Sequence, residues 1–282
     1  MNMGTYVVTG SASGMGRAAA ERLRAGGHLV IGVDLRDAEV IADLSTAHGR
    51  AEAAAAVLEL CGGRLDGAIM AGGVGPLPDR EAVRLILSVN YFGVVDLLQK
   101  WRPAFASGDN AKVVVVGSNS STTMPMVPHR AVRAMLRGDL DGAVRTLRRY
   151  RSIGPSFAYG ASKIAVSRWV RRHAVSPDWA AAGIRLNAIA PGAIRTPLLE
   201  KQLASPREAK AVRSFPVPVG GFGNPDHLAE WMVFMLSDAA EFLCGSVIFV
   251  DGGSDAYFRP ADWPKRVPTS RLPRYALRYL RG

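Results

Sequence analysis

The sequence predicts a single α/β domain built on a Rossmann-type, doubly wound parallel sheet of about seven strands. Two observations favour this fold. Short apolar runs rich in β-branched residues alternate with longer helical stretches from residue 5 to residue 250, and this alternation is typical of a parallel sheet with right-handed crossovers. Residues 113–116 are four valines in succession, and a strand that is apolar on both faces belongs inside a sheet covered by helices.

The expected elements follow one another along the chain without an internal repeat. Strands are expected at 5–9, 28–33, 38–42, 65–71, 113–116, 184–190 and 246–250. Helices are expected from residue 16 to residue 25 and at 46–60, 89–105, 158–175 and 226–236. Gly26 and Gly27 end the first helix, because glycine is a poor helix former and a common helix terminator.

Composition excludes several classes of protein. The chain has 282 residues, of which 48% are hydrophobic and 21% charged, which is globular composition. No apolar run approaches the roughly 18 residues of a membrane-spanning helix, and the N-terminus lacks the basic and apolar regions of a secretory signal, so we expect a cytoplasmic protein. Cys61 and Cys244 are too few for a disulfide scaffold, and the five histidines lack metal-ligand spacing, so no metal is expected.

Two segments interrupt the alternation and carry the net charge of +11. The first is a long insert, 120–157, whose central part, 129–152, has seven arginines against two aspartates. Its apolar residues recur at helical spacing, which predicts two short amphipathic helices joined near 138–142. Long insertions are often functional. The apolar faces either roof a hydrophobic substrate as a lid, or pack on the sheet edge or on a neighbouring subunit.

The second segment is a basic C-terminal extension, 259–282, that follows the catalytic domain, 1–258. It has seven basic residues against one aspartate, and the residues outside the two segments sum to zero charge. Near its end, apolar residues fall on one helical face (Leu272, Tyr275, Tyr279, Leu280) and arginines on another (Arg274, Arg278, Arg281). Docking across a dimer is the preferred interpretation; an anionic membrane surface and disorder are the alternatives. No nucleic-acid partner is expected, because the segments carry no recognised nucleic-acid-binding motif.

A glycine-rich turn links the first strand to the first helix. Gly10, Gly14 and Gly16 permit a tight turn and close backbone approach to a pyrophosphate, which the helix N-terminus attracts. Asp34 ends the second strand 18 residues after Gly16, where a carboxylate accepts hydrogen bonds from a ribose diol and repels a 2′-phosphate. The pattern predicts NAD as cofactor; NADP is less favoured, although Arg36 stands close enough to neutralise such a phosphate.

Tyr159 and Lys163 are four residues apart on a predicted helix and therefore share a face. A free phenol titrates near pH 10, too high for ready proton exchange at neutral pH. An adjacent ammonium favours the phenolate and lowers its pKa. Tyr159 is therefore a candidate general acid/base for an alcohol/carbonyl pair.

Together these motifs resemble the short-chain dehydrogenase/reductase family. The stretches that carry the resemblance are Thr9-Gly10-x3-Gly14-x-Gly16, Tyr159-x3-Lys163, Asn90-Tyr91-Phe92-Gly93, 187–196 and Val250-Asp251-Gly252-Gly253. The match covers about residues 4–256. Within the family, residues 34–46, the insert and Asp255-Ala256-x2-Arg259-Pro260 are most similar to bacterial 3α-hydroxysteroid dehydrogenase/carbonyl reductases, with coniferyl-alcohol dehydrogenases as close competitors. Ile69-Met70 stands where the family usually has two asparagines.

The resemblance implies a catalytic set of Asn90, Ser118, Tyr159 and Lys163. Tyr159 would exchange the proton, Lys163 would lower its pKa and hold the nicotinamide ribose, Ser118 would hydrogen-bond the substrate oxygen, and Asn90 would support a proton-carrying water. Ser120 is the alternative serine, because 41 residues separate Ser118 from Tyr159. The implied cofactor-binding residues are Gly10, Ser13, Gly14, Met15, Gly16, Asp34, Leu35, Asp43, Leu44, Ala71, Gly72, Tyr159, Lys163, Pro191, Gly192, Ile194 and Thr196.

The resemblance further implies an NAD-dependent oxidoreductase that interconverts a hydrophobic secondary alcohol and its ketone. The substrate would be steroid-, terpenoid- or aryl-alcohol-like, and the protein would be a homodimer or homotetramer. The rival hypothesis is an NAD-binding scaffold without turnover, or a peripheral membrane protein, that acts through the basic insert and extension. Retention of all four catalytic residues argues against this rival.

Overall fold

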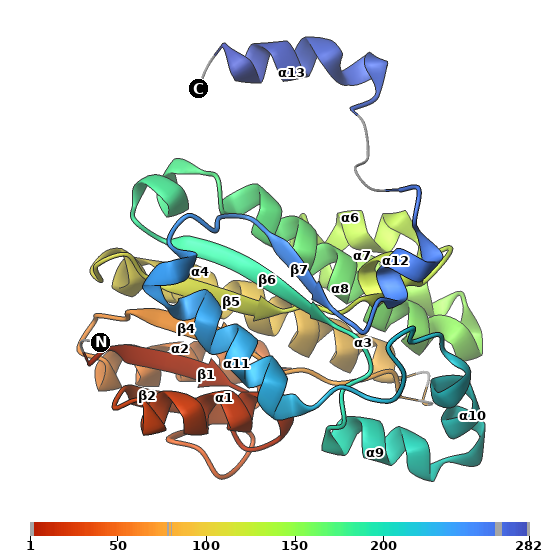
Figure 1. Ribbon diagram of the computed structural model, residues 1–282, viewed down its shortest axis with the longest axis horizontal. Helices are drawn as coiled ribbons and strands as arrows, with labels where there is room; N and C mark the ends of the chain where they lie inside the picture. The colour runs from red at the N-terminus through yellow and green to blue at the C-terminus, as the bar shows by residue number, and fades with distance from the viewer. Residues whose placement is uncertain (1–2, 78, 80, 263–266, 281–282) are drawn as a thin grey trace.

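The computed structural model describes residues 3–77, 79, 81–262 and 267–280. Seven parallel strands form one sheet in the order β3-β2-β1-β4-β5-β6-β7 (Figure 1). The strands are β1 (Thr5–Thr9), β2 (Leu29–Asp34), β3 (Val40–Ile41), β4 (Gly67–Met70), β5 (Lys112–Val116), β6 (Arg185–Pro191) and β7 (Val247–Val250). This sheet confirms the predicted fold. From β1 the chain builds outward in both directions, which creates a ligand-binding crevice at the carboxyl ends of β1 and β4.

Helices cover both faces of the sheet (Figure 1). One face carries α1 (Gly14–Ala25) and α11 (Pro225–Leu236), and the other carries α2 (Ala47–Leu60), α4 (Gly93–Ala106) and α8 (Gly154–His173). The shorter helical elements are α3 (Ala82–Leu87), η1 (Ser88–Phe92), α5 (Ser120–Thr123), α6 (His129–Met135), α7 (Leu140–Arg148), η2 (Arg151–Ile153), η3 (Pro177–Ala181), α9 (Pro197–Ala204), α10 (Pro206–Ser214), η4 (Asp238–Ala240), α12 (Ser254–Phe258), η5 (Thr269–Arg271) and α13 (Leu272–Tyr279).

The core lies on both sides of β5, as its four valines predict. Val113 and Val115 face the larger apolar cluster, under α2, α4 and α8, while Val114 and Val116 face the smaller cluster under α1 and α11. This alternation is the two-residue period of a strand. Burial on both faces holds the end of β5 rigidly, and the segment that follows it enters the candidate site.

The predicted helix 89–105 begins earlier than expected. α3, η1 and α4 form one continuous helical run, and the π-turn η1 contains Asn90. The run Ala82–Ala106 is long and apolar enough to cross a membrane by composition, but 72% of its most apolar window is buried inside the molecule. It is therefore a core helix of the α/β fold.

The insert contains the two amphipathic helices that its apolar spacing predicts, α6 and α7. Their apolar residues, including Met135 and Leu147, are fully buried against α3 and α8. Two ion pairs between the insert and the α3 region, Asp141 with Arg84 and Arg148 with Glu81, fasten α7 in place. The insert is therefore an integral layer of the domain.

α9 and α10 were not predicted from the sequence, whereas the helical arrangement near the end of the extension was. α9 and α10 follow β6, and each starts with a proline, after Thr196 and after Ser205. In the extension, the apolar and basic faces lie on α13, which stands apart from the rest of the molecule (Figure 1). Arg281 lies outside the described residues.

Candidate active site

The turn between β1 and α1 requires glycine for two geometric reasons. Gly10 has a φ of +70°, and a Cβ there would lie 2.8 Å from the backbone of Gly72. A Cβ at Gly16 would lie 2.2 Å from the carbonyl oxygen of Gly10. The turn therefore brings the α1 N-terminus, with its unpaired N–H groups, directly to the crevice at the end of β1.

A cavity of about 310 Å³ opens at this crevice. The predicted cofactor residues that line it are Gly10, Ser13, Gly14, Met15, Gly16, Asp34, Leu35, Asp43, Leu44, Ala71, Gly72 and Thr196. The glycines leave room in the turn, and with the helix N-terminus they fit the pyrophosphate of a dinucleotide. The acidic residue at the far end of the cavity fits its ribose.

The Asp34 carboxylate is held in a fixed orientation at the end of β2. Its Oδ2 accepts a hydrogen bond from the Ala12 amide at 3.0 Å, and its Oδ1 accepts one from the Leu35 amide at 2.7 Å. Each oxygen retains a free lone pair, because a carboxylate oxygen accepts two hydrogen bonds. The carboxylate can therefore receive further donors from a bound ribose without changing position.

Arg50, which the sequence analysis did not single out, supports the opposite wall of this cavity. Its side chain is buried on α2, Nε donates to Oδ2 of Asp96 at 2.8 Å and Nη1 donates to the carbonyl oxygen of Leu44 at 3.1 Å. The arginine thereby ties the loop containing Asp43 and Leu44 to α4. From the sequence alone, Arg50 is one more polar residue on an alanine-rich helix.

A second cavity, of about 530 Å³, continues from the first. The two cavities share Met15, Ala71, Gly73, Val74, Thr196 and Leu198. The predicted residues Ser118, Tyr159, Lys163, Pro191, Gly192, Ile194 and Thr196 line the second cavity. Its other wall is largely apolar and comes from α9, α10 and the residue after α10: Leu198, Leu199, Gln202, Ala211, Val212 and Phe215. A long ligand can therefore extend from Asp34 to Tyr159.

Ser118, Tyr159 and Lys163 meet beside the end of β5. Lys163 Nζ donates to the Val116 carbonyl at 2.9 Å and lies 5.8 Å from the centroid of the Tyr159 ring. Burial lowers the pKa of the Lys163 ammonium to about 8. Burial also raises the pKa of the Tyr159 phenol, and the hydrogen bond with the Ser118 side chain opposes that rise.

This result corrects the expected origin of the Tyr159 pKa. The sequence predicts that the Lys163 ammonium lowers it, since the two residues share a helix face. In the structure the partly buried phenol is desolvated, and Ser118 is the group that acts in the lowering direction. Desolvation disfavours charge on both Lys163 and Tyr159, which a sequence spacing does not reveal.

Asn90 uses its side chain to hold a cavity wall. It is 1% exposed; Oδ1 accepts from the Val74 amide at 2.8 Å, and Nδ2 donates to the Val74 carbonyl at 2.9 Å. Val74 and its neighbour Gly73 line both cavities. The structure therefore places Asn90 behind the wall, whereas Ser118, Tyr159 and Lys163 line the cavity itself.

Comparisons with known proteins agree with this architecture. The chain is 38% identical over 261 residues to the 3-alpha-hydroxysteroid dehydrogenase/carbonyl reductase of Comamonas testosteroni, which covers 93% of this chain and 100% of that protein. A sequence model of the short chain dehydrogenase family matches residues 5–131, and one described as enoyl-(acyl carrier protein) reductase matches residues 148–255. The chain belongs to the short-chain dehydrogenase/reductase family.

Other members of this family show the same likeness. The crystal structure of the 3-alpha-hydroxysteroid dehydrogenase from Pseudomonas sp. B-0831, complexed with NADH, has a TM-score of 0.85 and 42% identity, with 92% of this chain and all of that chain covered. The 3beta-hydroxysteroid dehydrogenase 1 of Eggerthella lenta is 30% identical over 90% of this chain and 94% of its own length. As a short-chain dehydrogenase/reductase, the protein is an oxidoreductase that uses NAD(P), and the two joined cavities fit that cofactor.

In this family member, both candidate serines line the substrate side of the site. The Ser120 amide donates to Ser118 Oγ at 3.1 Å. Ser120 Oγ is buried without a hydrogen-bond partner among the described residues. Ser118 is therefore the serine that contacts Tyr159, while the Ser120 hydroxyl is free to meet a ligand.

The insert helices do not roof the short-chain dehydrogenase/reductase site. Of the described insert residues, those lining the second cavity are Ser120, Thr123, Met124 and Pro125, and none comes from α6 or α7. The apolar faces of α6 and α7 pack into the core, so they are not available above Ser118 and Tyr159.

Among all the residues that the structure describes, no cluster of His, Cys, Asp and Glu could hold a metal ion.

Proposed function

We propose that this protein is an NAD-dependent dehydrogenase that interconverts a hydrophobic secondary alcohol and its ketone, with Tyr159 as the proton donor and acceptor. The observation that carries the proposal is the position of Tyr159. It is hydrogen-bonded to Ser118 and lies with Lys163 on an apolar cavity that continues into the dinucleotide cavity. A reacting carbon held against the Tyr159 phenol would therefore lie beside the nicotinamide end of a bound cofactor.

When bound, the nicotinamide accepts a hydride from the alcohol or gives one to the ketone. Pro191, Gly192, Ile194 and Thr196 would orient it along one wall of the second cavity. In ketone reduction, the Tyr159 hydroxyl donates its proton to the substrate oxygen as charge develops there, and the Ser118 hydroxyl stabilises that charge by hydrogen bonding. In alcohol oxidation, the Tyr159 phenolate takes the proton back.

Lys163 acts on this step through position and charge. Its hydrogen bond to the Val116 carbonyl holds α8 against the end of β5, two residues before Ser118. Its side chain lines the second cavity, where its ammonium can donate to the ribose of the bound cofactor. Asn90 supports the same site indirectly, because it fixes the backbone of Val74.

Asp34 supports NAD as the preferred cofactor. A carboxylate at this position accepts hydrogen bonds from the two ribose hydroxyls and repels a 2′-phosphate. Arg36, the residue closest in sequence that could neutralise a phosphate, has a side chain that is 82% exposed and approaches the Asp37 carboxylate at 4.0 Å. The fixed negative charge at Asp34 therefore decides the preference.

The lining of the second cavity supports a hydrophobic substrate. Leu198, Leu199, Val212 and Phe215 line it together with Ser118 and Tyr159, and Gln202 and Ser120 add polar groups. The relatives named for hydroxysteroids support a steroid-like alcohol, and terpenoid and aryl alcohols have the same apolar character. We also propose that the protein is a homodimer or homotetramer, which light scattering tests, and that it is cytoplasmic, which cell fractionation tests.

Initial rates with NAD and NADP over steroid, terpene and aryl alcohols test the proposal. We expect kcat/KM to be higher with NAD and to rise with the apolar size of the alcohol up to the cavity volume. The proposal would be wrong if binding of NADH were measurable but no alcohol or ketone in the panel reacted. That outcome would favour the scaffold hypothesis.

A further inference from the structure

α13 presents an amphipathic surface that no other described element covers. Leu272, Tyr275 and Tyr279 recur at three- and four-residue spacing, so they lie on one face of the helix. Their side chains are 50%, 59% and 83% exposed, and the adjoining Leu280 is 80% exposed. Such a cluster of large apolar side chains on a solvent-exposed surface marks an interaction site.

The other face of α13 is positively charged. Arg274 and Arg278 are one turn apart on it, and Arg271 immediately precedes the helix. None of these three arginines forms an ion pair with a described carboxylate. The helix therefore combines exposed apolar side chains with uncompensated positive charge.

A second group of arginines lies on the body of the molecule. We define this basic face by Arg133 on α6 and by Arg168 and Arg172 on α8, all of which are exposed. Partial burial lowers the pKa of the Arg168 guanidinium, and the charges of Arg172 and Arg133 lower it further. The three charges therefore lie close together. No ion pair to a carboxylate is formed by these three residues within the described part of the chain.

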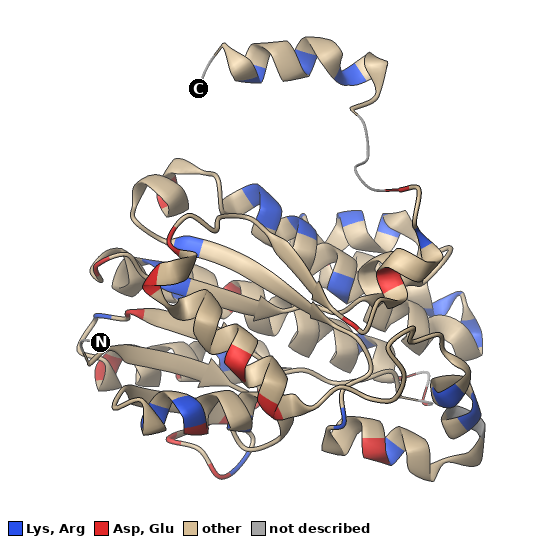
Figure 2. Ribbon diagram, viewed as in Figure 1, with Lys and Arg blue, Asp and Glu red and all other residues tan. Residues whose placement is uncertain are grey.

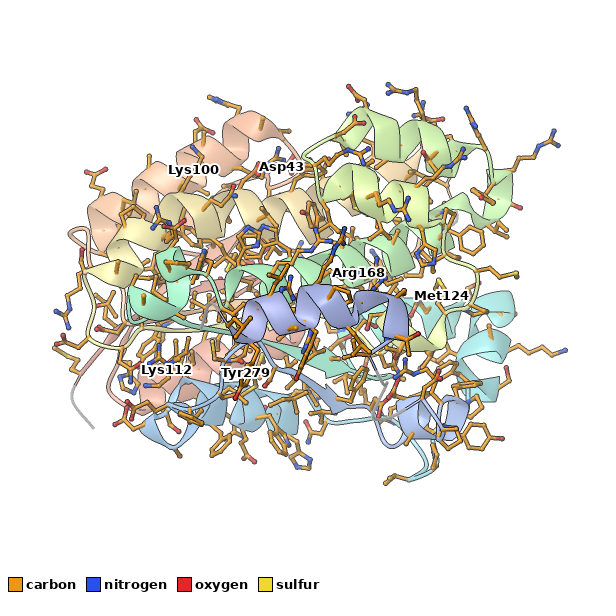
Figure 3. All side chains as sticks on the ribbon, turned by 90° about the horizontal axis from the view of Figure 1, so that it is seen from above. Asp43, Lys100, Lys112, Met124, Arg168 and Tyr279 are labelled. Carbon is orange, nitrogen blue, oxygen red and sulfur yellow. The ribbon has the colours of Figure 1, made fainter. Side chains whose placement is uncertain are left out.

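The basic face and α13 lie on the same side of the molecule. Figure 1 shows α13 above α6 and α8, and Figure 2 shows Lys and Arg along both this upper side and α13. In Figure 3, which views the molecule from above, α13 crosses in front of the body, with Tyr279 near one end and Arg168 on the side of the body that faces the viewer, behind the helix. Because both groups are positive, mutual repulsion opposes docking of α13 onto the basic face.

The chemistry of the surface selects among three kinds of partner. In a second copy of this chain the residues outside the insert and the extension sum to zero charge, so its body offers no overall attraction to these arginines. A nucleic acid would attract the arginines and could stack bases on the two tyrosines, but it would leave Leu272 and Leu280 without an apolar partner. An anionic lipid surface satisfies both requirements, since it accepts the apolar face into the headgroup boundary and pairs the arginines with phosphates.

We propose that α13, together with the basic face, binds the protein to the surface of an anionic phospholipid bilayer. α13 lies beyond residue 255, where the matching family models end, so this interaction is an addition to the catalytic domain. One amphipathic segment of this length binds weakly by itself, and a basic patch on the same side supplies the second contribution that stable attachment requires. The proposal does not depend on the proposed function.

Vesicle sedimentation with the full-length protein tests this proposal. Vesicles of equal parts phosphatidylcholine and phosphatidylglycerol are compared with vesicles of phosphatidylcholine alone at physiological ionic strength. We expect sedimentation with the anionic vesicles only. Arg274→Glu should lower the partition coefficient at least about tenfold, because each basic residue near the surface contributes about fivefold. Tyr275→Ser should also lower it, although the charge is unchanged.

Lys100→Glu is the matched control. Lys100 is an exposed residue of α4, Figure 3 shows it away from α13, and its replacement changes the net charge by the same amount as Arg274→Glu. We expect Lys100→Glu to change vesicle binding about twofold or less. Equal binding to both kinds of vesicle, an equal loss in Arg274→Glu and Lys100→Glu, or self-association without vesicles that Arg274→Glu abolishes would each overturn the proposal. The last result would assign α13 to a second copy.

Discussion

Lys163 donates a hydrogen bond from Nζ to the carbonyl oxygen of Val116 at 2.9 Å. This bond joins the middle of α8 to the last residue of β5. Tyr159 precedes Lys163 by one helical turn, and Ser118 follows Val116 by two residues, so the bond fixes the two proposed reacting side chains relative to each other. Lys163 therefore has a positioning role in addition to any charge that it brings to the site.

We expect Lys163 to make the stability of the protein depend on pH in a defined window. Its pKa falls from 10.5 to about 8 on folding. Below pH 8 both states are protonated and the cost of burying the ammonium is fully present. As the pH rises from 8 to 10.5 the folded state loses its proton first, so the free energy of unfolding rises, by about 3 kcal/mol in total.

Lys163→Met should flatten this rise, because it removes the titrating group and keeps much of the buried volume. Urea unfolding of both proteins at several values between pH 7 and pH 10 measures the effect. The titration of Tyr159 does not affect the free energy of unfolding in this pH range. Its folded pKa is raised above 10, so its contribution is present below pH 10 and is lost only as the pH rises further. Parallel pH curves for the two proteins would contradict the prediction.

The two serines should differ in their effect on catalysis. Ser118→Ala removes the hydrogen bond to Tyr159 and the proposed donor to the substrate oxygen, so kcat should fall about 10²–10³-fold. Ser120→Ala removes a hydroxyl that has no hydrogen-bond partner among the described residues, and kcat should fall less than about tenfold. Steady-state rates of the two variants, with NADH binding as a control for folding, decide between them. The reverse order would identify Ser120 as the catalytic serine.

Asp34 should control the choice between NAD and NADP. Asp34→Asn keeps the shape of the side chain but removes the charge that repels a 2′-phosphate. We expect the ratio of kcat/KM for NAD to that for NADP to fall about tenfold or more, since a repulsion of one to a few kcal/mol is removed. An unchanged ratio would mean that the carboxylate does not discriminate between the cofactors. Arg36→Gln tests the alternative that this arginine neutralises the phosphate, and we expect it to leave the ratio nearly unchanged, because the Arg36 side chain is exposed.

Phe215 should contribute to substrate size selectivity, although the insert helices should not. Phe215→Ala removes apolar surface from the second cavity and should raise KM for bulky alcohols about tenfold, with a smaller effect on short alcohols. Met135→Ala, in the buried face of α6, should instead lower the free energy of unfolding by about 2–5 kcal/mol and leave KM unchanged for alcohols of every size. Size-selective KM effects of Met135→Ala would restore the lid hypothesis for α6.

The parts of the site that follow local rules could be predicted from the sequence. The turn at Gly10 and Gly16, the strand of Val113–Val116 and the acidic end of β2 at Asp34 each depend on nearby residues whose types allow few conformations. Every predicted cofactor residue lies on one of the two joined cavities. Residue type and spacing indicated the glycine turn and Asp34, and the family resemblance implied the remaining cofactor residues.

The parts that depend on distant contacts could not be predicted. α10 has a mostly polar sequence, and Ala209 is the buried one among its described side chains, so its role as a cavity wall follows from where α9 places it. The apolar spacing of α6 and α7 predicted helices but not which surface they cover. Burial of Tyr159 comes from several elements together, so the direction of its pKa shift required the folded structure. Pro197 and Pro206, which directly follow Thr196 and Ser205, were the local sequence signals for the starts of α9 and α10.

The central claim is that Tyr159 moves the proton, and Tyr159→Phe tests it most directly because it removes one oxygen atom from a partly buried side chain. Rates of alcohol oxidation and ketone reduction are measured with saturating cofactor, and NADH affinity is measured separately by fluorescence. We predict a fall in kcat of about 10²–10⁴-fold in both directions with NADH affinity changed less than about threefold. A kcat close to that of the unmodified protein, with intact NADH binding, would contradict the account.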